Sequence, residues 1–347
     1  MNEAGLQRLA DRAHAAAEAD EHALAAGLFE ELAVAAGPRL LVVHQATVLA
    51  AEAWRKAEQP LRALAAARAG RDAGGAQGVI ARLTEAGSLL ELGRLAESES
   101  ALQAALATAE VEALRTLALD AGCGIAMARG DIGTAQARAE ELARTAPPAA
   151  RPAVAFRSAA LRRLAGDLVA ADALLAGVED AAEGNPAWRG PHAAALHERA
   201  ELALLTGQAE LAITRFRGAE AAWALARRGG PGALARSGQA RAGLLSRHPP
   251  PPGFLDADLS AARLSGASLR FADLQVVRGL LRAAHGVSGA ESDLEAGIQA
   301  FSRMGARLRE GRARLRRRMA GILQGDLART RACLEGDVVW LSRVPAA

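Results

Sequence analysis

The sequence lacks tyrosine and contains a single lysine, Lys56, so arginine carries almost all of its positive charge. Phenylalanine and tryptophan are also few, and the 51% hydrophobic share comes largely from alanine and leucine. Alanine and leucine are strong helix formers, whereas the aromatic residues that favour strands are scarce. We therefore expect an all-α protein.

The scarcity of lysine also limits the chemistry that is open to the chain. A phosphate-binding P-loop needs a glycine-rich segment that ends in lysine, and the only lysine lies in AWRKAEQ without a glycine before it. A Schiff-base enzyme would have to use Lys56, and the GxSxG pattern of serine hydrolases is absent. We expect no enzyme, no catalytic residue and no cofactor.

The segment HERAE contains half of a zinc-peptidase motif. His197 and Glu198 are present, but Glu201 stands where the second histidine of HExxH would be needed. The sequence therefore predicts no metal site. His197 and Glu201 lie four residues apart on one helix face, where we expect a hydrogen-bonded pair or part of a groove lining.

Cysteine and long apolar runs are scarce as well. Cys123 and Cys333 form neither a CxxC pair nor a metal-binding spacing, so we interpret them as structural thiols in a reducing compartment. The first residues are charged throughout and contain no basic stretch followed by an apolar one. The sequence contains no run of eighteen uncharged apolar residues, so it predicts no membrane-spanning helix. We expect a cytoplasmic protein that does not contact membranes.

What the sequence does contain is a repeated turn. Short Gly, Asp or Pro turns, each followed by Leu, Ile or Ala, recur near positions 20, 58, 93, 130, 166, 207, 250, 289 and 325, at intervals of 35 to 43 residues. Helix, short turn and second helix at this period predict a solenoid of helix hairpins. The sequence thus predicts one α-solenoid of about nine hairpins over residues 1–347, with a proline-rich loop at 247–254.

The segment GFLDADLSAARLSGASLRFADLQ, residues 253–275, has two readings. Cut in fives from Ala257, it places alanine first and leucine third in each unit, which resembles the pentapeptide-repeat family and its β-solenoid. Its apolar residues also follow helical spacings, and five residues make about 1.4 helical turns. Because helical repeats stand on both sides, we favour the helix and expect residues 255–269 to form the second helix of the seventh hairpin.

The hairpins resemble the tetratricopeptide family, in which repeats of about 34 residues carry small residues where helices pack. The repeat around Gly207 is the best match, with Ala200 on its first helix and Ala212, Phe216 and Ala219 on its second. The repeats around Gly93, Gly130 and Gly166 offer Ala86, Ser98, Leu102 and Ala105; Cys123, Ala135, Ala139 and Leu142; and Ala159, Ala171 and Leu175. The usual first-helix tryptophan and tyrosine are missing and the period is long, which indicates a divergent branch.

The segment LEAGIQAFSRMGARLREGRARLRR is similar to the repeat regions of large bacterial regulators, signal ATPases and kinase-linked repeat proteins. This resemblance implies a right-handed superhelix that binds a protein or an effector in a signalling system. Our leading interpretation is a non-catalytic scaffold that binds a protein or peptide in its concave groove. The alternative is an effector-sensing module of a transcriptional regulator or signal ATPase.

The tetratricopeptide resemblance implies which residues line the groove. Carried over repeat by repeat, they are Ile80, Leu83 and Leu90; Leu117, Asp120 and Met127; Phe156 and Arg163; and His197, Glu201 and Leu204. Apolar anchors with a few charges suit an extended or helical peptide, oriented by Asp120, Arg163 and Glu201. Burial of several of these residues between helices is the competing interpretation.

Positive charge is concentrated near the end of the chain. Residues 1–150 carry 14 Lys/Arg against 20 Asp/Glu, a net of −6, which leaves 28 against 19, a net of +9, for residues 151–347. The sequence predicts an arginine-rich helix at 303–318, with a basic patch formed by Arg312, Arg314, Arg316, Arg317 and Arg318. Such a patch would bind nucleic-acid phosphates, but we favour a solvated helix whose arginine stems cover its neighbours.

Overall fold

The computed structural model describes residues 1–182 and 188–323, and these residues form helices joined by short turns, without a strand. The first hairpins are built by α1 (Glu3–Glu18), α2 (His22–Ala36), α3 (Leu40–Lys56), α4 (Pro60–Gly70), α5 (Gly75–Glu91), α6 (Leu95–Thr108), α7 (Glu112–Arg129) and α8 (Ile132–Thr145). After the 3-10 turn η1 (Pro148–Ala150) follow α9 (Arg151–Leu164), α10 (Leu168–Ala182), α11 (Arg189–Leu205), α12 (Ala209–Leu225), α13 (Gly229–Leu245), α14 (Asp256–Ser265), α15 (Ser268–Ala284), α16 (Ala290–Met304) and α17 (Arg307–Leu323).

The predicted turns of the first six hairpins are confirmed. Each contains one residue in the left-handed backbone region, at Asp20, Glu58, Gly93, Gly130, Gly166 and Gly207. A left-handed residue ends a helix by reversing the chain after its last carbonyls. The all-α solenoid of tetratricopeptide-like hairpins predicted from the repeat is therefore the observed architecture, and the proline-rich segment 247–254 lies in the loop between α13 and α14.

The expectation for residues 255–269 is confirmed in type and wrong in extent. The segment is helical, but α14 ends at Ser265 and α15 starts at Ser268. Gly266 separates them with φ +75°, and an alanine there would be strained in this backbone region. The pentapeptide-like pattern therefore runs across a helix boundary, so the seventh hairpin has a short second helix.

The arginine-rich run is also divided. Arg303 belongs to the last turn of α16, Gly305 ends that helix with φ +71°, and α17 begins at Arg307. The predicted helix at 303–318 was thus wrong at its start. The described residues hold eight hairpins followed by α17, and the predicted turn near 325 and Cys333 lie outside the described residues.

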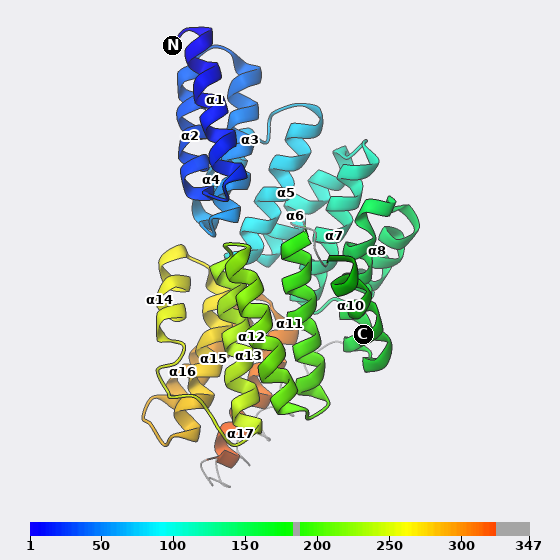
Figure 1. Ribbon diagram of the computed structural model, residues 1–347, viewed down its shortest axis with the longest axis vertical. Coiled ribbons are helices and arrows are strands. Elements are labelled where there is room, and N and C mark those ends of the chain that lie inside the picture. Colours follow the sequence, from blue (N-terminus) through cyan, green and yellow to red (C-terminus); the bar gives the residue numbers. More distant parts are fainter. Residues whose placement is uncertain (183–187, 324–347) are drawn as a thin grey trace.

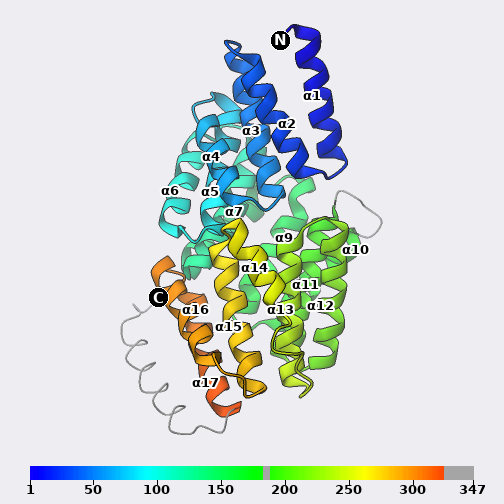
Figure 2. The same ribbon diagram turned by 90° about the vertical axis from the view of Figure 1, so that its left-hand side faces the viewer.

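The hairpins wind into a superhelix that returns toward its own beginning. Each hairpin packs on the next, and the first helices α5, α7, α9, α11, α13 and α15 contact one another in order. Figures 1 and 2 show the chain turning around from α5 to α17, with the N-terminal hairpins extending to one end. As a result α15 contacts α5, and α17 contacts α7. The inner face, the side lined by these first helices, is therefore enclosed along part of its length.

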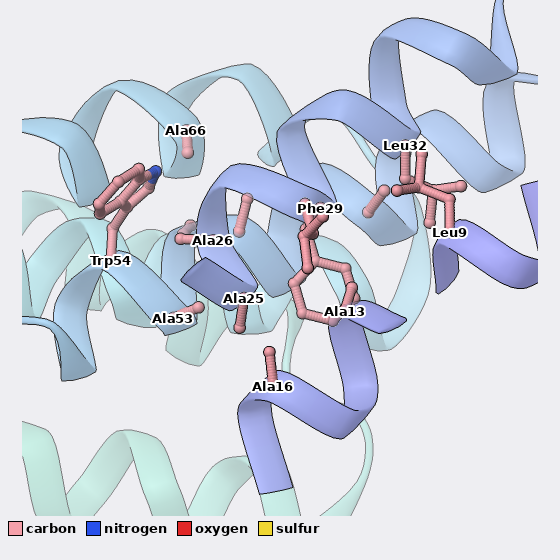
Figure 3. Close-up of a cluster of buried hydrophobic side chains, with 14 of the residues drawn as sticks. Leu9, Ala13, Ala16, Ala25, Ala26, Phe29, Leu32, Ala53, Trp54 and Ala66 are labelled. Atoms are coloured by element: carbon pink, nitrogen blue, oxygen red, sulfur yellow. The ribbon is translucent and has the colours of Figure 1, made fainter. Parts of the chain in front are cut away.

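Alanine makes the tight helix packing possible. In the N-terminal hairpins α1–α4, Ala13, Ala25 and Ala26 are fully buried and allow Phe29 to lie between the helices, as Figure 3 shows. The predicted packing residues Ala200, Ala212, Phe216 and Ala219 are likewise buried together. Short side chains bring helix backbones close, and the few large side chains fill the remaining volume.

The return of the superhelix creates a closing seam, where α5 and the turns at Glu58 and Gly93 meet α13–α16. The Glu58 carboxylate accepts hydrogen bonds from the Gly230 backbone N–H, at 2.8 and 2.6 Å, and from Arg270 at 3.0 Å. Gly230 lies in the first turn of α13, where the helix dipole favours a negative charge. Met304 lies so close to Gly93 that a Cβ there would be 2.6 Å from its sulfur.

Candidate functional site on the inner face

The structure places the predicted groove residues on or beside the inner face. All of the following are half-buried: Ile80, Leu83, Leu90, Asp120, Met127, Phe156, Arg163, His197, Glu201 and Leu204. Leu117 is exposed. The apolar members are partly used for packing, since Leu83 and Leu90 contact the cluster around Leu102 and Ile125, and Phe156 contacts the cluster around Leu175.

The charged groove residues are paired with neighbouring first helices. Asp120 of α7 accepts hydrogen bonds from Arg157 of α9 at 2.7 and 3.1 Å. Arg163 of α9 lies 2.9 Å from the Glu198 carboxylate of α11. These ion pairs join α7 to α9 and α9 to α11, so the charges hold neighbouring repeats together and do not stand free for a ligand.

The same pattern continues from α11 to α13. Glu201 accepts a hydrogen bond from Arg241 at 3.0 Å, and the Arg241 guanidinium stacks on the ring of Phe216. Although burial opposes its ionisation, the Arg241 cation holds the pKa of the Glu201 carboxyl well below its usual range. The carboxylate is therefore ionised at any pH near neutrality.

His197 lies beside this pair, with Nε2 3.7 Å from Glu201 Oε1. This distance is too long for the hydrogen bond that was one of our two expectations. Burial lowers the pKa of the imidazole, although Glu201 and Glu198 act in the opposite sense. His197 is thus a neutral ring packed edge to face against Phe216.

Two arginines of α17, Arg312 and Arg316, lie within electrostatic range of the charged residues of the inner face. α17 contacts α7 beside Gly130 and is tied to α15 by the ion pair between Arg309 and Asp273. From there Arg312 comes within electrostatic range of Arg163, Glu198 and Glu201, and Arg316 within range of Arg241 and Glu201. Among residues 1–182 and 188–323, neither Arg312 nor Arg316 has a hydrogen-bond or ion-pair partner, although both are half-buried.

Burial and neighbouring cations act strongly on these two groups. Burial, followed by the Arg163 cation, lowers the pKa of Arg312, and burial with Arg241 lowers the pKa of Arg316 to about 9. Both remain charged at neutral pH. With the pairs Arg157 and Asp120, Arg163 and Glu198, and Arg241 and Glu201 balanced, this part of the inner face carries an excess of two positive charges.

The rest of the predicted basic patch points elsewhere. Arg314 binds Glu310 at 2.8 Å, Arg317 binds Glu295, and Arg318 also has an interaction partner. Of the five arginines, Arg312 and Arg316 therefore lie near the inner face, whereas Arg314 and Arg317 contact α17 and α16. The five do not form one continuous cationic surface, which leaves binding to a nucleic-acid backbone a prediction without added support.

Cys123 is buried on α7, and burial raises the pKa of its thiol to about 11, so it is not a thiolate nucleophile at neutral pH. No group of three or more His, Cys, Asp or Glu side chains within residues 1–182 and 188–323 is arranged to hold a metal ion. In the same residues, no helix is long and apolar enough to cross a bilayer.

Sequence reasoning missed the partners of the charged groove residues, Arg157, Glu198 and Arg241. A signal for them does exist in the spacing. Arg157 follows Asp120 by 37 residues and Arg241 follows Glu201 by 40, which is one repeat period in each case. A carboxylate and an arginine one repeat apart on first helices lie side by side in a solenoid, so the period itself predicts such pairs.

Comparison with known proteins adds little. No family model matches the sequence. No curated protein matches it either. Among solved structures, the chain is similar to a tetratricopeptide repeat protein from Parabacteroides merdae, with 13% sequence identity and a TM-score of 0.38, covering 75% of this chain and 91% of that chain.

Proposed function

We propose that this helical-repeat chain is a non-catalytic binding module that takes an acidic segment of a protein or peptide on its inner face. The observation that carries the proposal is the pair Arg312 and Arg316, two half-buried cations that have no partner in the described part of the chain, on a face where neighbouring charges are balanced. A charge taken out of water is costly unless it is paired. An incoming carboxylate would supply the missing partner.

The spacing of the two arginines suits such a ligand. Residues four apart on a helix project from the same face. Arginine presents a planar fork that binds carboxylates through two hydrogen bonds, which is stronger and more directional than a point charge. A segment with two acidic side chains would therefore engage both, with Leu83, Leu90 and Phe156 as half-buried apolar contacts further along the inner face.

The residues proposed to recognise the ligand differ from those that the sequence predicted. Asp120, Arg163 and Glu201 pair within the chain and support the geometry of the inner face, so recognition moves to α17. Because α17 packs across the inner face, a ligand would be held between α17 and the first helices α9–α13.

A labelled acidic peptide with alternating Asp, Glu and Ala tests the proposal, with the matching Asn, Gln and Ala peptide as the neutral probe. Fluorescence anisotropy should show that Arg312→Gln with Arg316→Gln weakens binding of the acidic peptide at least about tenfold. Each charge-assisted hydrogen bond contributes about 1.5–3 kcal/mol, and 1.4 kcal/mol is tenfold in affinity.

The chain offers a matched control on α1. Arg8 and Arg12 have the same spacing and are exposed, so Arg8→Gln with Arg12→Gln removes the same charge from the outside of the molecule. Binding should remain unchanged in that variant. An equal loss in both variants would mean that only net charge matters, and would overturn the proposal, as would equal binding of the neutral peptide.

A further inference from the structure

A cleft lies on the closing seam, outside the inner face. Its volume is about 580 Å³, and it is formed by the α5–α6 turn, the α14–α15 junction and the second half of α16. Its apolar wall is formed by Leu92, Ala262, Phe271, Ala296, Ala300 and Met304. A volume of this size and a mainly apolar wall are typical of sites for small molecules.

The polar lining of the cleft has one sign of charge. Arg263 at the end of α14 and Arg303 at the end of α16 both line it, and no acidic residue does within the described part of the chain. With respect to the residues that the structure describes, Arg263 has no hydrogen bond or ion pair, and Arg303 donates only to the Gln299 carbonyl, at 3.3 Å. Ser268 and Gln275 add neutral hydrogen-bonding groups.

The carboxylates on the surrounding helices are engaged elsewhere. Asp258 of α14 pairs with Arg236, Asp273 of α15 with Arg309, and Glu295 of α16 with Arg317. On the other side of the seam, Glu91 lies 3.8 Å from Arg270. The cleft is thus left with two uncompensated cations above an apolar wall.

We propose that this cleft binds a small amphipathic carboxylate, with its apolar body against Phe271 and Met304 and its carboxylate on Arg263 and Arg303. The two arginines of the lining favour an anionic group, and the apolar wall favours an apolar body. A carboxylate fits the fork of an arginine side chain, whereas a cation would meet two like charges. This ligand site is independent of the acidic segment proposed for the inner face.

Ligand binding at this place is coupled to closure of the superhelix. The walls come from the α5–α6 turn on one side and from α14–α16 on the other, so the cleft exists only when the seam is closed. A ligand that binds one conformation alone shifts the equilibrium toward it. The ligand should therefore reduce amide hydrogen exchange on both sides of the seam.

Titration calorimetry of the full chain with decanoate tests the site, with decanol as the neutral probe of the same length. Decanoate should bind saturably and at least about ten times more tightly than decanol. Arg263→Gln with Arg303→Gln should weaken decanoate at least about tenfold, because both changed side chains are exposed cations of the cleft. Arg144→Gln with Arg217→Gln removes the same charge from exposed positions elsewhere and should leave binding unchanged.

A second variant removes the space and keeps the charge. Ala296→Trp would fill the cleft from α16 and should abolish decanoate binding, with the circular dichroism of the helices retained. If Ala296→Trp does not fold, the variant with Arg263→Gln and Arg303→Gln still tests the site, because replacing exposed side chains leaves the packing intact. Decanoate should also slow hydrogen exchange in both α5–α6 and α15–α16 of the unaltered chain.

Three results would overturn the proposal. The first is no saturable binding of decanoate. The second is equal binding of decanoate and decanol, or equal loss in both arginine pairs, which would indicate apolar partition or bulk charge. The third is protection of only one side of the seam, which would place the ligand on a surface that does not bridge the two parts. Since none of these variants changes Arg312 or Arg316, failure here would leave the inner-face proposal standing.

Discussion

The N-terminal hairpins α1–α4 and the closed part of the superhelix, α5–α17, use different interactions to join their helices. In α1–α4 a single apolar cluster spans residues 6–67, and the one polar link between helices that stands out is the Trp54 indole N–H donating to Glu30 at 2.7 Å. In α5–α17, arginine–carboxylate pairs join α7 to α9, α9 to α11 and α11 to α13 along the first helices. The pair of Arg68 with Glu85, at 2.9 Å, also joins α4 to α5. These first-helix pairs lie where the first helices face an enclosed interior.

The difference teaches how a solenoid can stabilise a polar interior. A paired and hydrogen-bonded charge can be held away from water, whereas an unpaired one is costly. In the closed part, the pairs of the first helices also join neighbouring repeats, so the polar interior contributes to holding the repeats together. The N-terminal hairpins, which do not close on themselves, are held by local apolar packing.

The largest expected effect on stability comes from removing one buried aromatic side chain in each of the two regions. Phe29→Ala and Phe301→Ala should each reduce the free energy of unfolding by about 3–5 kcal/mol, because each residue is at most 2% exposed. The two variants should differ in which helices show faster amide hydrogen exchange. Phe29→Ala should expose α1–α4 only, since its cluster is local.

Phe301→Ala should expose α6 and α7 in addition to α15–α17, because its cluster includes Leu95 and Ala128. Leu95 lies near the α5–α6 turn and Ala128 near the α7–α8 turn, and both are far from Phe301 in sequence. Increased exchange confined to α15–α17 would show that the seam contributes little to stability, and would contradict the closed arrangement.

An intermediate effect is expected from proline at the α14–α15 junction. Ala262→Pro should cost about 3 kcal/mol in urea unfolding, because Ala262 is buried inside α14. Ser268→Pro should cost less than about 1 kcal/mol, because Ser268 is the first residue of α15 and proline suits that position.

The chain already contains this geometry at α4. Pro60 is the first residue of α4 and follows Gln59 with ψ 70°, while Ala267 before Ser268 has ψ 71°. Ser268→Pro is therefore a control for proline itself. Similar costs for both variants would mean that one helix continues through Gly266.

The smallest effect is expected from one ion pair of the interior. Glu201→Gln should lower the free energy of unfolding at pH 7 by about 2–3 kcal/mol, less than a fully buried pair would, because its side chain is 17% exposed. The pKa of Glu201 is held low in the folded chain, so its stabilising contribution is present above the unfolded pKa of about 4.3 and is lost as the pH falls.

Urea unfolding at several pH values measures this contribution. The difference between the unaltered chain and Glu201→Gln should be constant near neutrality and shrink below about pH 4. Glu97→Gln, which changes an exposed carboxylate paired with Arg94, should show no measurable change. A difference for Glu201→Gln that stays the same from neutral to acid pH would contradict its role as an ionised partner of Arg241.

Much of the local structure was predictable because it depends on short-range rules. The recurring turns placed left-handed residues at Gly93, Gly130, Gly166 and Gly207, and the small residues Ala200 and Ala212 were buried as expected. The pentapeptide-like segment was helical but was divided at Gly266. A glycine inside an apolar pattern is compatible with either a continued helix or a left-handed end, and only the packing of α14 and α15 on their neighbours selects one.

By itself, the sequence determined an all-α array of hairpins, because helix propensity, turn chemistry and repeat period are properties of neighbouring residues. Only the tertiary structure decided that α15 and α17 return to α5 and α7, because superhelical curvature accumulates from small rotations between many repeats. That return paired Glu58 with Gly230, turned Arg312 and Arg316 toward the inner face and formed the cleft beside Arg263 and Arg303. Contacts between residues up to 212 positions apart carry no local signal that the sequence could show.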